Sequence, residues 1–415
     1  MAANASLGSG GEDFQVSTYG LSVGDERELG KCFHLYTAVE EGRGEAGLHL
    51  DARECRVSCS DPLASMGAGI YQIDPLGDPR WSEFVAHHPR SSFYHSQPWL
   101  ESLKRTYGYR PVAYTTSPPG CELRNGLVFC RIESWLTGRR IVSLPFSDHC
   151  DPLVGSDGEF AKVITDLLQV FQKEHWEYTE LRPRTTIGHL SLGLAPGKQY
   201  CFHFLDLSSG VKELYSSLHK DCIQRKIRRA DREGLEYREG RSRALLAIFY
   251  RLFVKMRQRH GLPPQPFAWF VNLAECLGPA MQVRIALHRG RPAASILTVV
   301  YRDTMTYKYG CSDPDLTKFG GTPWLFWKVI LEAKSTGLRE LDLGRSDWKN
   351  PGLITFKDRL GAKRVPVTYW RFPKAQGVAD ALPAGRLQRL AGEMFLHMPA
   401  PLLSATGRLL YRHFG

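Results

Sequence analysis

The chain has 415 residues, of which 43% are apolar and 23% charged, a composition typical of folded proteins with a buried core rather than of disordered or fibrous chains. No apolar run reaches the roughly 18 residues of a membrane-spanning helix. The formal net charge of +11 favours anionic partners such as phosphorylated intermediates, nucleic acid or an anionic bilayer surface, without choosing among them. Ten cysteines with no CxxC pair indicate reduced thiols in a cytosolic protein.

Residues 1–65 show neither a helical nor a strand pattern, and we expect a poorly ordered N-terminal extension. Met66 comes just before the first convincing strand, so a start site upstream of the true one is an alternative explanation of this extension. We predict a first α/β domain over 66–207. Its expected helices span 81–88, 97–107 and 158–175, and its expected strands span 70–73, 111–115, 126–132, 139–144, 178–182 and 200–207.

Residues 208–372 repeat that order. A basic helix over about 218–233 is followed by helices over 243–260, 267–277 and 323–335, and by strands over 282–287, 293–301, 304–309, 340–343 and 365–371. Each half contains a meander of short strands, then a helix, then a strand. The sequence therefore predicts an α/β (α+β) fold of two tandem domains, each a mixed, mostly antiparallel sheet flanked by helices.

The basic helix is the most distinctive local feature. Ile223, Ile227 and Ala230 recur at i, i+4 and i+7 and form one apolar stripe, so the basic side chains must spread over the remaining surface. Gly234 is expected to end the helix. The pattern indicates a site for an anionic ligand, and a solvated charged helix face is the alternative.

Three segments together carry a resemblance to a known family. They are Arg-Lys-Ile-Arg-Arg-Ala at 225–230, Tyr-Lys-Tyr-Gly-Cys-Ser at 307–312, and Phe-Lys-Asp-Arg-Leu-Gly at 356–361, the last preceded by Asp-Leu-Gly-Arg at 342–345. Their order and spacing resemble those of the Fem family of peptidoglycan-bridge aminoacyltransferases and its FemAB-related relatives. The resemblance spans about residues 70–372 and implies two tandem GNAT-like domains, over 66–207 and 208–372.

The resemblance also implies a function. It implies an acyl- or aminoacyltransferase acting on an amine of a cell-envelope precursor, peptidoglycan or polysaccharide, with aminoacyl-tRNA or acyl-CoA as co-substrate and no tightly bound cofactor. A CoA-dependent N-acyltransferase of exopolysaccharide synthesis is the alternative enzyme. Fem proteins carry a helical arm that we do not find between residues 239 and 284, and this keeps the CoA alternative open. An RNA-binding module using residues 219–232 is the alternative from another class.

Three residues are the predicted catalytic ones. By the resemblance, Lys357 neutralises charge developing on a carbonyl or holds a donor phosphate; the alternative is a surface lysine beside a strand. Asp148 flanks His149 and is the candidate base, with a turn residue as its alternative. Tyr309 lies on the strand whose backbone amide, in GNAT-like folds, is offered to the carbonyl. No spacing joins His149 to further zinc ligands, so we predict no metal site.

The glycine-bearing loop at 318–321 occupies the place where GNAT-like folds bind phosphate through a helix N-terminus. Pro323 stands at the final small position of the CoA-binding pattern, which disfavours a conventional grip on the CoA pyrophosphate. Arg345 and Asp347 follow a strand, where they belong to a site or form a local ion pair. The predicted substrate-binding residues are Arg225, Lys226, Arg229, Lys308, Lys318, Gly320, Gly321, Arg345, Asp347, Phe356 and Arg359.

Residues 373–415 read as a basic amphipathic helical tail in two short helices interrupted at Pro399 and Pro401. Such helices suit an anionic bilayer surface, and packing on the protein's own body is the alternative. We therefore expect a cytoplasmic protein that contacts a membrane peripherally where this tail binds a bilayer. Its expected partners are an anionic small-molecule or lipid-linked envelope precursor and, where aminoacyl-tRNA is the donor, tRNA. The whole hypothesis places Arg225 and Lys357 on opposite walls of one crevice.

Overall fold

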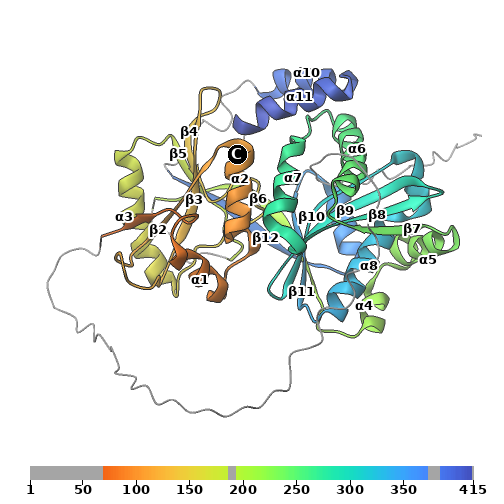
Figure 1. Ribbon diagram of the computed structural model, residues 1–415, viewed down its shortest axis with the longest axis horizontal. Coiled ribbons are helices and arrows are strands. Elements are labelled where there is room, and N and C mark those ends of the chain that lie inside the picture. Colours follow the sequence, from red (N-terminus) through yellow and green to blue (C-terminus); the bar gives the residue numbers. More distant parts are fainter. Residues whose placement is uncertain (1–68, 186–192, 373–383, 414–415) are drawn as a thin grey trace, which may run out of the picture.

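The computed structural model describes residues 69–185, 193–372 and 384–413, with side chains of the last segment described from residue 391. The predicted N-terminal extension and the first part of the tail lie outside these residues. Twelve strands form one continuous mixed sheet in the order β1-β2-β3-β4-β5-β12-β6-β11-β10-β9-β8-β7, with helices on both faces (Figure 1).

The first half of the sheet begins as an antiparallel meander. Its elements are β1 (Tyr71–Ile73), α1 (Pro79–His87), a 3-10 turn (Phe93–His95), α2 (Gln97–Tyr107), β2 (Arg110–Thr115), β3 (Leu127–Ser134), β4 (Gly138–Val142), α3 (Asp157–Lys173) and β5 (Tyr178–Leu181). Strands β1 to β4 pair antiparallel in chain order, and β4 then pairs parallel with β5. Helix α3 crosses over between these two parallel strands.

The second half repeats the arrangement. Its elements are β6 (Ala195–Asp206), α4 (Val211–Ser217), a π-helical turn (Lys220–Gln224), α5 (Arg225–Arg232), β7 (Glu236–Gly240), α6 (Arg243–Arg259), α7 (Phe267–Leu277), β8 (Met281–His288), β9 (Arg291–Tyr301), β10 (Thr304–Ser312), α8 (Gly321–Ser335), β11 (Glu340–Asp347), α9 (Pro351–Arg359) and β12 (Lys363–Phe372). The predicted order of meander, helix and strand is thus confirmed, and β10 and β11 are the parallel pair.

Alternation along the central strands explains the two helical layers. On β8, Met281, Val283 and Ile285 face the core that α6 and α7 cover, whereas Ala286 faces the core under α8 and α5. Ile223, Ile227 and Ala230 are buried in that second core, as their spacing predicted. The basic segment is not one regular helix, because a π-helical turn precedes α5.

Two strands join the halves in a way that the sequence prediction did not contain. β12, predicted with the second domain, pairs with β5 of the first half as well as with β6. β6, predicted with the first domain, pairs with β11 of the second half as well as with β12. The sheet therefore crosses the expected boundary at residue 207, and the division into 66–207 and 208–372 stays a proposal.

Both parallel strand pairs separate after a short contact. β4 and β5 pair only from Arg140 to Val142, and β10 and β11 pair only from Thr304 to Thr306. Beyond these points β10 pairs with β9 and β11 pairs with β6, and each of the two strands carries a bulge there. Where the strands diverge, their facing backbone groups and side chains do not pair with each other and can contact other groups at the middle of the molecule.

The tail forms α10 (Ala384–His397) and α11 (Ala400–Leu410), as expected for two helices interrupted near Pro399. The inward face of α11 packs on the protein itself: Leu403 is fully buried, and Oη of Tyr250 on α6 donates a hydrogen bond to Oγ of Ser404. Packing on the body, the alternative considered from the sequence, thus describes this face. No helix in the described ranges has the length and apolar character needed to cross a bilayer.

Candidate active site

A polar cluster lies where the two halves meet, and Asp148 is at its centre. Its carboxylate accepts hydrogen bonds from Nζ of Lys308 and from Oη of Tyr94, each at 2.8 Å. Nε of Arg345 lies 3.5 Å from the other carboxylate oxygen. Asp148 and Tyr94 come from the first half, and Lys308 and Arg345 come from β10 and β11. The cluster is therefore assembled only when both halves are in place.

The segment before Asp148 is held in an unusual backbone conformation. Leu144 and Phe146 both have positive φ values, 61° and 60°, which residues other than glycine rarely adopt. Such conformations persist where the surrounding structure enforces them, and they concentrate at functional sites. Oη of Tyr369, on β12, donates a hydrogen bond of 2.9 Å to the carbonyl of Asp148. The backbone thus aims Asp148 at β10 and β11.

The charge of Asp148 is strongly stabilised. Burial would raise the pKa of this carboxyl, but the cations of Lys308 and Arg345, with the hydrogen bonds from Lys308 and Tyr94, hold the pKa at about 2. A carboxylate with so low a pKa is a weak proton acceptor near neutral pH. The geometry therefore favours an anchor for Lys308 and Arg345 over the general base expected from the sequence.

Lys357, on α9, is buried rather than on the surface, with 3% of its area exposed. Its ammonium donates hydrogen bonds to the carbonyls of Gly344, at 3.1 Å, and Arg345, at 3.3 Å. Burial lowers the pKa of Lys357 to about 8, against the opposing effect of Asp148 and Asp342. The side chain is thus mostly charged at neutral pH and lies directly behind the backbone that carries Arg345.

Gly344 is the point where these groups converge. Its φ is +70°, and a Cβ atom there would lie 3.2 Å from a carboxylate oxygen of Asp148. Only glycine combines this backbone conformation with so close an approach. The guanidinium of Arg345 then stacks over the ring of Tyr200, 4.1 Å from its centroid, and lies 5.2 Å from that of Tyr369.

A second pair of residues links the halves beside this cluster, and sequence reasoning gave it no role. Nε2 of His149 lies 3.2 Å from Oδ2 of Asp342, and both side chains are buried. The other carboxylate oxygen of Asp342 accepts a hydrogen bond from the amide of Gly344 at 2.7 Å. Asp342 thereby fixes the turn of backbone at Gly344, and its place two residues before that glycine was the available signal.

Two of the predicted site residues, Tyr309 and Asp347, have contacts typical of residues that stabilise the fold. The hydroxyl of Tyr309 accepts a hydrogen bond of 3.0 Å from Nε1 of Trp269, and its ring packs in the core against Phe270. Its contribution to the cluster is the ring, 5.5 Å from Nζ of Lys308. Asp347 is exposed and accepts a hydrogen bond from the amide of Lys349, as a turn residue does.

The remaining predicted residues gather mainly around the start of α8. A Cβ atom on Gly320, whose φ is +79°, would lie 2.3 Å from the carbonyl oxygen of Lys226, so the loop and α5 are in direct contact. The cations of Lys318 and Arg229 lie 5.3 Å and 5.7 Å from the ring centroid of Phe319. Gly320 caps α8 without a side-chain hydrogen bond, and Gly321 is its first residue. Backbone amides and two cations at one helix N-terminus favour an anion.

The printed contacts of the last three predicted residues, Arg225, Phe356 and Arg359, are of other kinds. Arg225 is exposed and forms a 3.8 Å ion pair with Asp221. Phe356 packs in the core, 5.5 Å from the ring of Phe326. The carbonyl of Arg359 accepts a hydrogen bond from the amide of His219. Because Arg225 points outward and Lys357 inward, these contacts do not support the single crevice expected between them.

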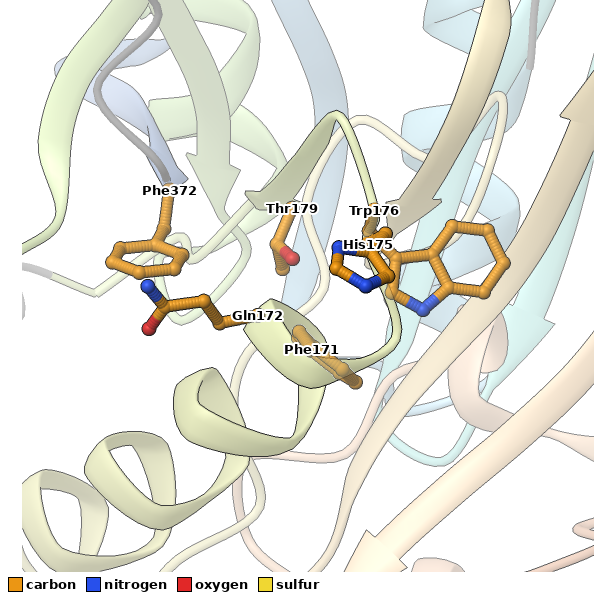
Figure 2. Close-up of a pocket in the computed structure, with 6 residues that line it drawn as sticks. All are labelled: Phe171, Gln172, His175, Trp176, Thr179 and Phe372. Carbon is orange, nitrogen blue, oxygen red and sulfur yellow. The ribbon is translucent and has the colours of Figure 1, made fainter.

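A cavity elsewhere in the first half contains none of the predicted residues. It has a volume of about 330 Å³ and lies where α3 ends and β5 begins (Figure 2). Its walls are Phe171, Gln172, His175, Trp176, Thr179 and Phe372. The cavity therefore involves neither the junction around Asp148 nor the start of α8.

Comparison with known proteins identifies a matched domain and a similar fold. Residues 219–357 match the acetyltransferase (GNAT) domain. The UDP-N-acetylmuramoylpentapeptide-lysine N(6)-alanyltransferase of Weissella viridescens is 26% identical over 161 residues, which are 38% of this chain and 46% of that protein. The crystal structure of FemX superposes with a TM-score of 0.54 at 13% identity, over 69% of this chain and 94% of FemX. This chain contains an acetyltransferase (GNAT) domain, and its fold is similar to that of FemX.

One more solved structure is similar, and the curated relative is matched over only part of its length. The C-terminal domain of a putative lysylphosphatidylglycerol synthetase from Agrobacterium fabrum superposes with a TM-score of 0.48 at 14% identity, over 76% of this chain and 94% of that domain. The chain spans slightly less than half the length of the curated alanyltransferase that it matches. The likeness to FemX confirms the predicted fold, and the matched GNAT residues include both Lys226 and Lys357.

Proposed function

We propose that the chain transfers an acyl or aminoacyl group to an amine of a cell-envelope precursor, in peptidoglycan or a polysaccharide. The observation that carries this proposal is the junction cluster, in which Lys357, Arg345 and Lys308 converge on the separated ends of β10 and β11 around Gly344. The similarity to an alanyltransferase named for a lysine-containing muramoyl pentapeptide supports the acceptor class.

The chemistry follows from the charges at the junction. Attack of an amine on an ester or thioester carbonyl places negative charge on the carbonyl oxygen, and fixed cations beside it lower the barrier. Lys357, with a pKa of about 8, is largely protonated at neutral pH, and Arg345 is held in place by Asp148. Catalysis by positioning and charge stabilisation then needs no covalent enzyme intermediate.

The start of α8 is the proposed place for the donor's phosphate groups. Its uncapped amides lie beside Lys318 and Arg229, and a phosphodiester or pyrophosphate presents the matching charge. Both candidate donors, acyl-CoA and aminoacyl-tRNA, carry such groups. The donor is the co-substrate of this proposal, and the acceptor is an anionic small-molecule or lipid-linked precursor.

One observation favours acyl-CoA as the donor. Between β7 and β8, the helices are α6 and α7, of 17 and 11 residues, and α6 packs along β8, β9 and β10. The projecting helical arm that the Fem resemblance implies is not present in this stretch of described residues. The CoA-dependent N-acyltransferase is therefore the second candidate function. Binding of aminoacyl-tRNA is tested separately, by thermal stability.

The function is tested in cells and in a matched pair of variants. We expect mass spectrometry of muropeptides and envelope glycans to reveal a modified amine that disappears when the gene is deleted. Restoring the wild-type gene or Lys363→Ala, a change at an exposed lysine 64% accessible to solvent, should restore it. Lys357→Ala should reduce product formation about 100-fold or more, because a fixed cation at the carbonyl is lost. An unchanged envelope, or full activity of Lys357→Ala, contradicts the proposal.

The donor is decided by ligand-dependent thermal stability. A donor that binds the folded chain raises its melting temperature according to its concentration relative to the dissociation constant. Stabilisation by acyl-CoA supports the N-acyltransferase, and stabilisation only by aminoacyl-tRNA supports the Fem-type donor. Arg229→Gln with Lys318→Gln should reduce either shift, whereas Arg408→Gln, an exposed change on α11, should leave it unaltered.

A further inference from the structure

The turn between β3 and β4 presents large apolar side chains to solvent. Trp135 is 87% exposed and Leu136 is 44% exposed. Isolated exposed leucines are common on protein surfaces. An indole at the tip of a hairpin exposes a large apolar area that does not stabilise the fold, and such areas are typical of interaction sites. The adjoining residues explain why the tip keeps this position: Oγ of Ser134 accepts hydrogen bonds from the amides of Leu136 and Thr137.

Helix α11 presents a second apolar stripe on its outward side. Leu402 is 58% exposed and Leu409 is 66% exposed, and their spacing of seven residues places them on one face of the helix. This stripe is distinct from the inward face, where Leu403 and Gly407 pack on the body. On α10, Met394 is 54% exposed. The tail is thus apolar on two sides, and only one of them is covered.

The end of the tail joins this stripe to the hairpin. Oγ of Ser134 lies 2.9 Å from Nδ1 of His413, and Oγ1 of Thr137 donates a hydrogen bond of 2.6 Å to the carbonyl of His413. The ring of Trp135 lies 5.5 Å from that of His413. Figure 1 shows the β3–β4 hairpin and the two tail helices along the same edge of the molecule. We call these residues the hairpin–tail face: Trp135, Leu136, Met394, Leu402 and Leu409.

The exposed charges beside this face are mixed, with arginines in excess of glutamates. Arg408 and Arg412 are exposed on the tail next to the leucine stripe, and Arg139 is exposed on the hairpin. Glu133 forms a 3.6 Å ion pair with Arg139, and Glu393 is exposed on α10. Arginines placed around exposed indole and leucine side chains match the boundary of an anionic bilayer, where phosphates lie above acyl chains.

We propose that the hairpin–tail face docks the protein on an anionic phospholipid surface. Trp135 and Leu136 enter the region between headgroups and acyl chains, the outward leucines of α11 lie along it, and the arginines contact lipid phosphates. From the sequence, membrane contact was expected of the tail alone; the structure adds the hairpin and selects the residues. The proposal does not depend on the transferase chemistry, since the face shares no residue with the junction cluster.

The test measures partition of the full chain onto vesicles. Vesicles of phosphatidylcholine with phosphatidylglycerol should bind the wild-type chain, and added salt or vesicles of phosphatidylcholine alone should weaken binding. Trp135→Ala with Leu136→Ala, and separately Leu402→Ser with Leu409→Ser, should each lower partition about tenfold or more. Val211→Ser, which alters a 42% exposed apolar residue on α4, is the matched control and should bind as the wild type does.

Circular dichroism melting curves check that each variant remains folded. The two pairs of substitutions lie on different elements, so if one double variant does not fold, the other still tests the proposal. Wild-type failure to bind anionic vesicles overturns the proposal. Equal binding by the wild type and a folded double variant overturns it as well. If sedimentation shows a dimer that both double variants dissociate, the face is an interface between two copies of the chain and the bilayer assignment is wrong.

Discussion

At Asp148, one carboxylate balances two cations drawn from the other half of the sheet. Lys308 is only 4% exposed at its side chain, so a lost counter-ion would leave its charge with little water to solvate it. The depressed pKa of Asp148 means that the stabilisation is present at any pH above the unfolded value of about 3.8 and is lost as the pH falls through about 2. The cluster is therefore intact under physiological conditions.

Asp148→Asn should destabilise the chain by about 3–5 kcal/mol at pH 7, because it leaves Lys308 buried beside Arg345 without a compensating charge. Adding Lys308→Met should recover part of that loss, since the buried charge is removed with its partner. Urea unfolding monitored by fluorescence measures both. Asp166→Asn, at a partly exposed carboxylate on α3, is the control and should change stability by less than about 0.5 kcal/mol. An equal loss in the single and double variants would contradict the coupling.

Sequence reasoning found the charged residues at the centre of this cluster and missed the residues that hold them in place. Lys308, Arg345 and Lys357 came from family-like segments, and Asp148 came from its place beside a histidine. Tyr94, Tyr369 and Asp342 were missed because their partners lie far along the chain: 54 residues separate Tyr94 from Asp148, and 193 separate His149 from Asp342. Contacts of that kind depend on how the strands pair, which local spacing does not encode.

At the scale of elements, the helices were predicted best where both ends carry local signals. Residues 97–107 begin after Ser96 with Pro98 in the first turn and end at Gly108, whose φ is +72°, and α2 has those bounds. α9 was missed, because Pro351 and Gly352 read as a loop although Pro at a first helical position is favourable. β7 was missed because most of its residues are exposed and polar.

The contact between the loop at Gly320 and α5 gives a prediction for an element. Gly320→Ala would place a Cβ atom 2.3 Å from the carbonyl oxygen of Lys226, in addition to the strain of a φ of +79°. Gly337→Ala has a comparable φ of +76° with nothing within 4 Å, so it isolates the strain alone. We expect Gly337→Ala to cost about 1–2 kcal/mol of unfolding free energy and Gly320→Ala distinctly more.

Urea unfolding compares the two variants, and donor-dependent thermal stabilisation should be lost only with Gly320→Ala, whose loop must move away from α5. Equal costs for the two substitutions would mean that the loop yields easily, and the start of α8 would then be a poor place to hold phosphate groups in a fixed position.

For the molecule as a whole, β6 and β12 link the two halves, because each of them pairs with a strand of the other half. β12 lies between β5 and β6, and β6 lies between β12 and β11, so neither half closes its sheet with strands from its own side of residue 207. Hydrophobic periodicity predicted that both segments are strands, but it carries no information about which neighbour each one pairs with. The arrangement makes the junction cluster a property of the joined sheet.

The whole chain should consequently unfold as one unit. Hydrogen exchange in increasing denaturant measures the unfolding free energy at individual amides. The slowest-exchanging amides of β3, in the first half, and of β9, in the second half, should give the same value. Val367→Asp, which places a charge at a 1% exposed position of β12, should lower both values together because both halves lose one shared strand. Lys363→Ala, at an exposed position of the same strand, should leave both nearly unchanged. If Val367→Asp lowered the value for β3 alone or β9 alone, the halves would be independent domains, and the residues of the junction would need another account of how they are held together.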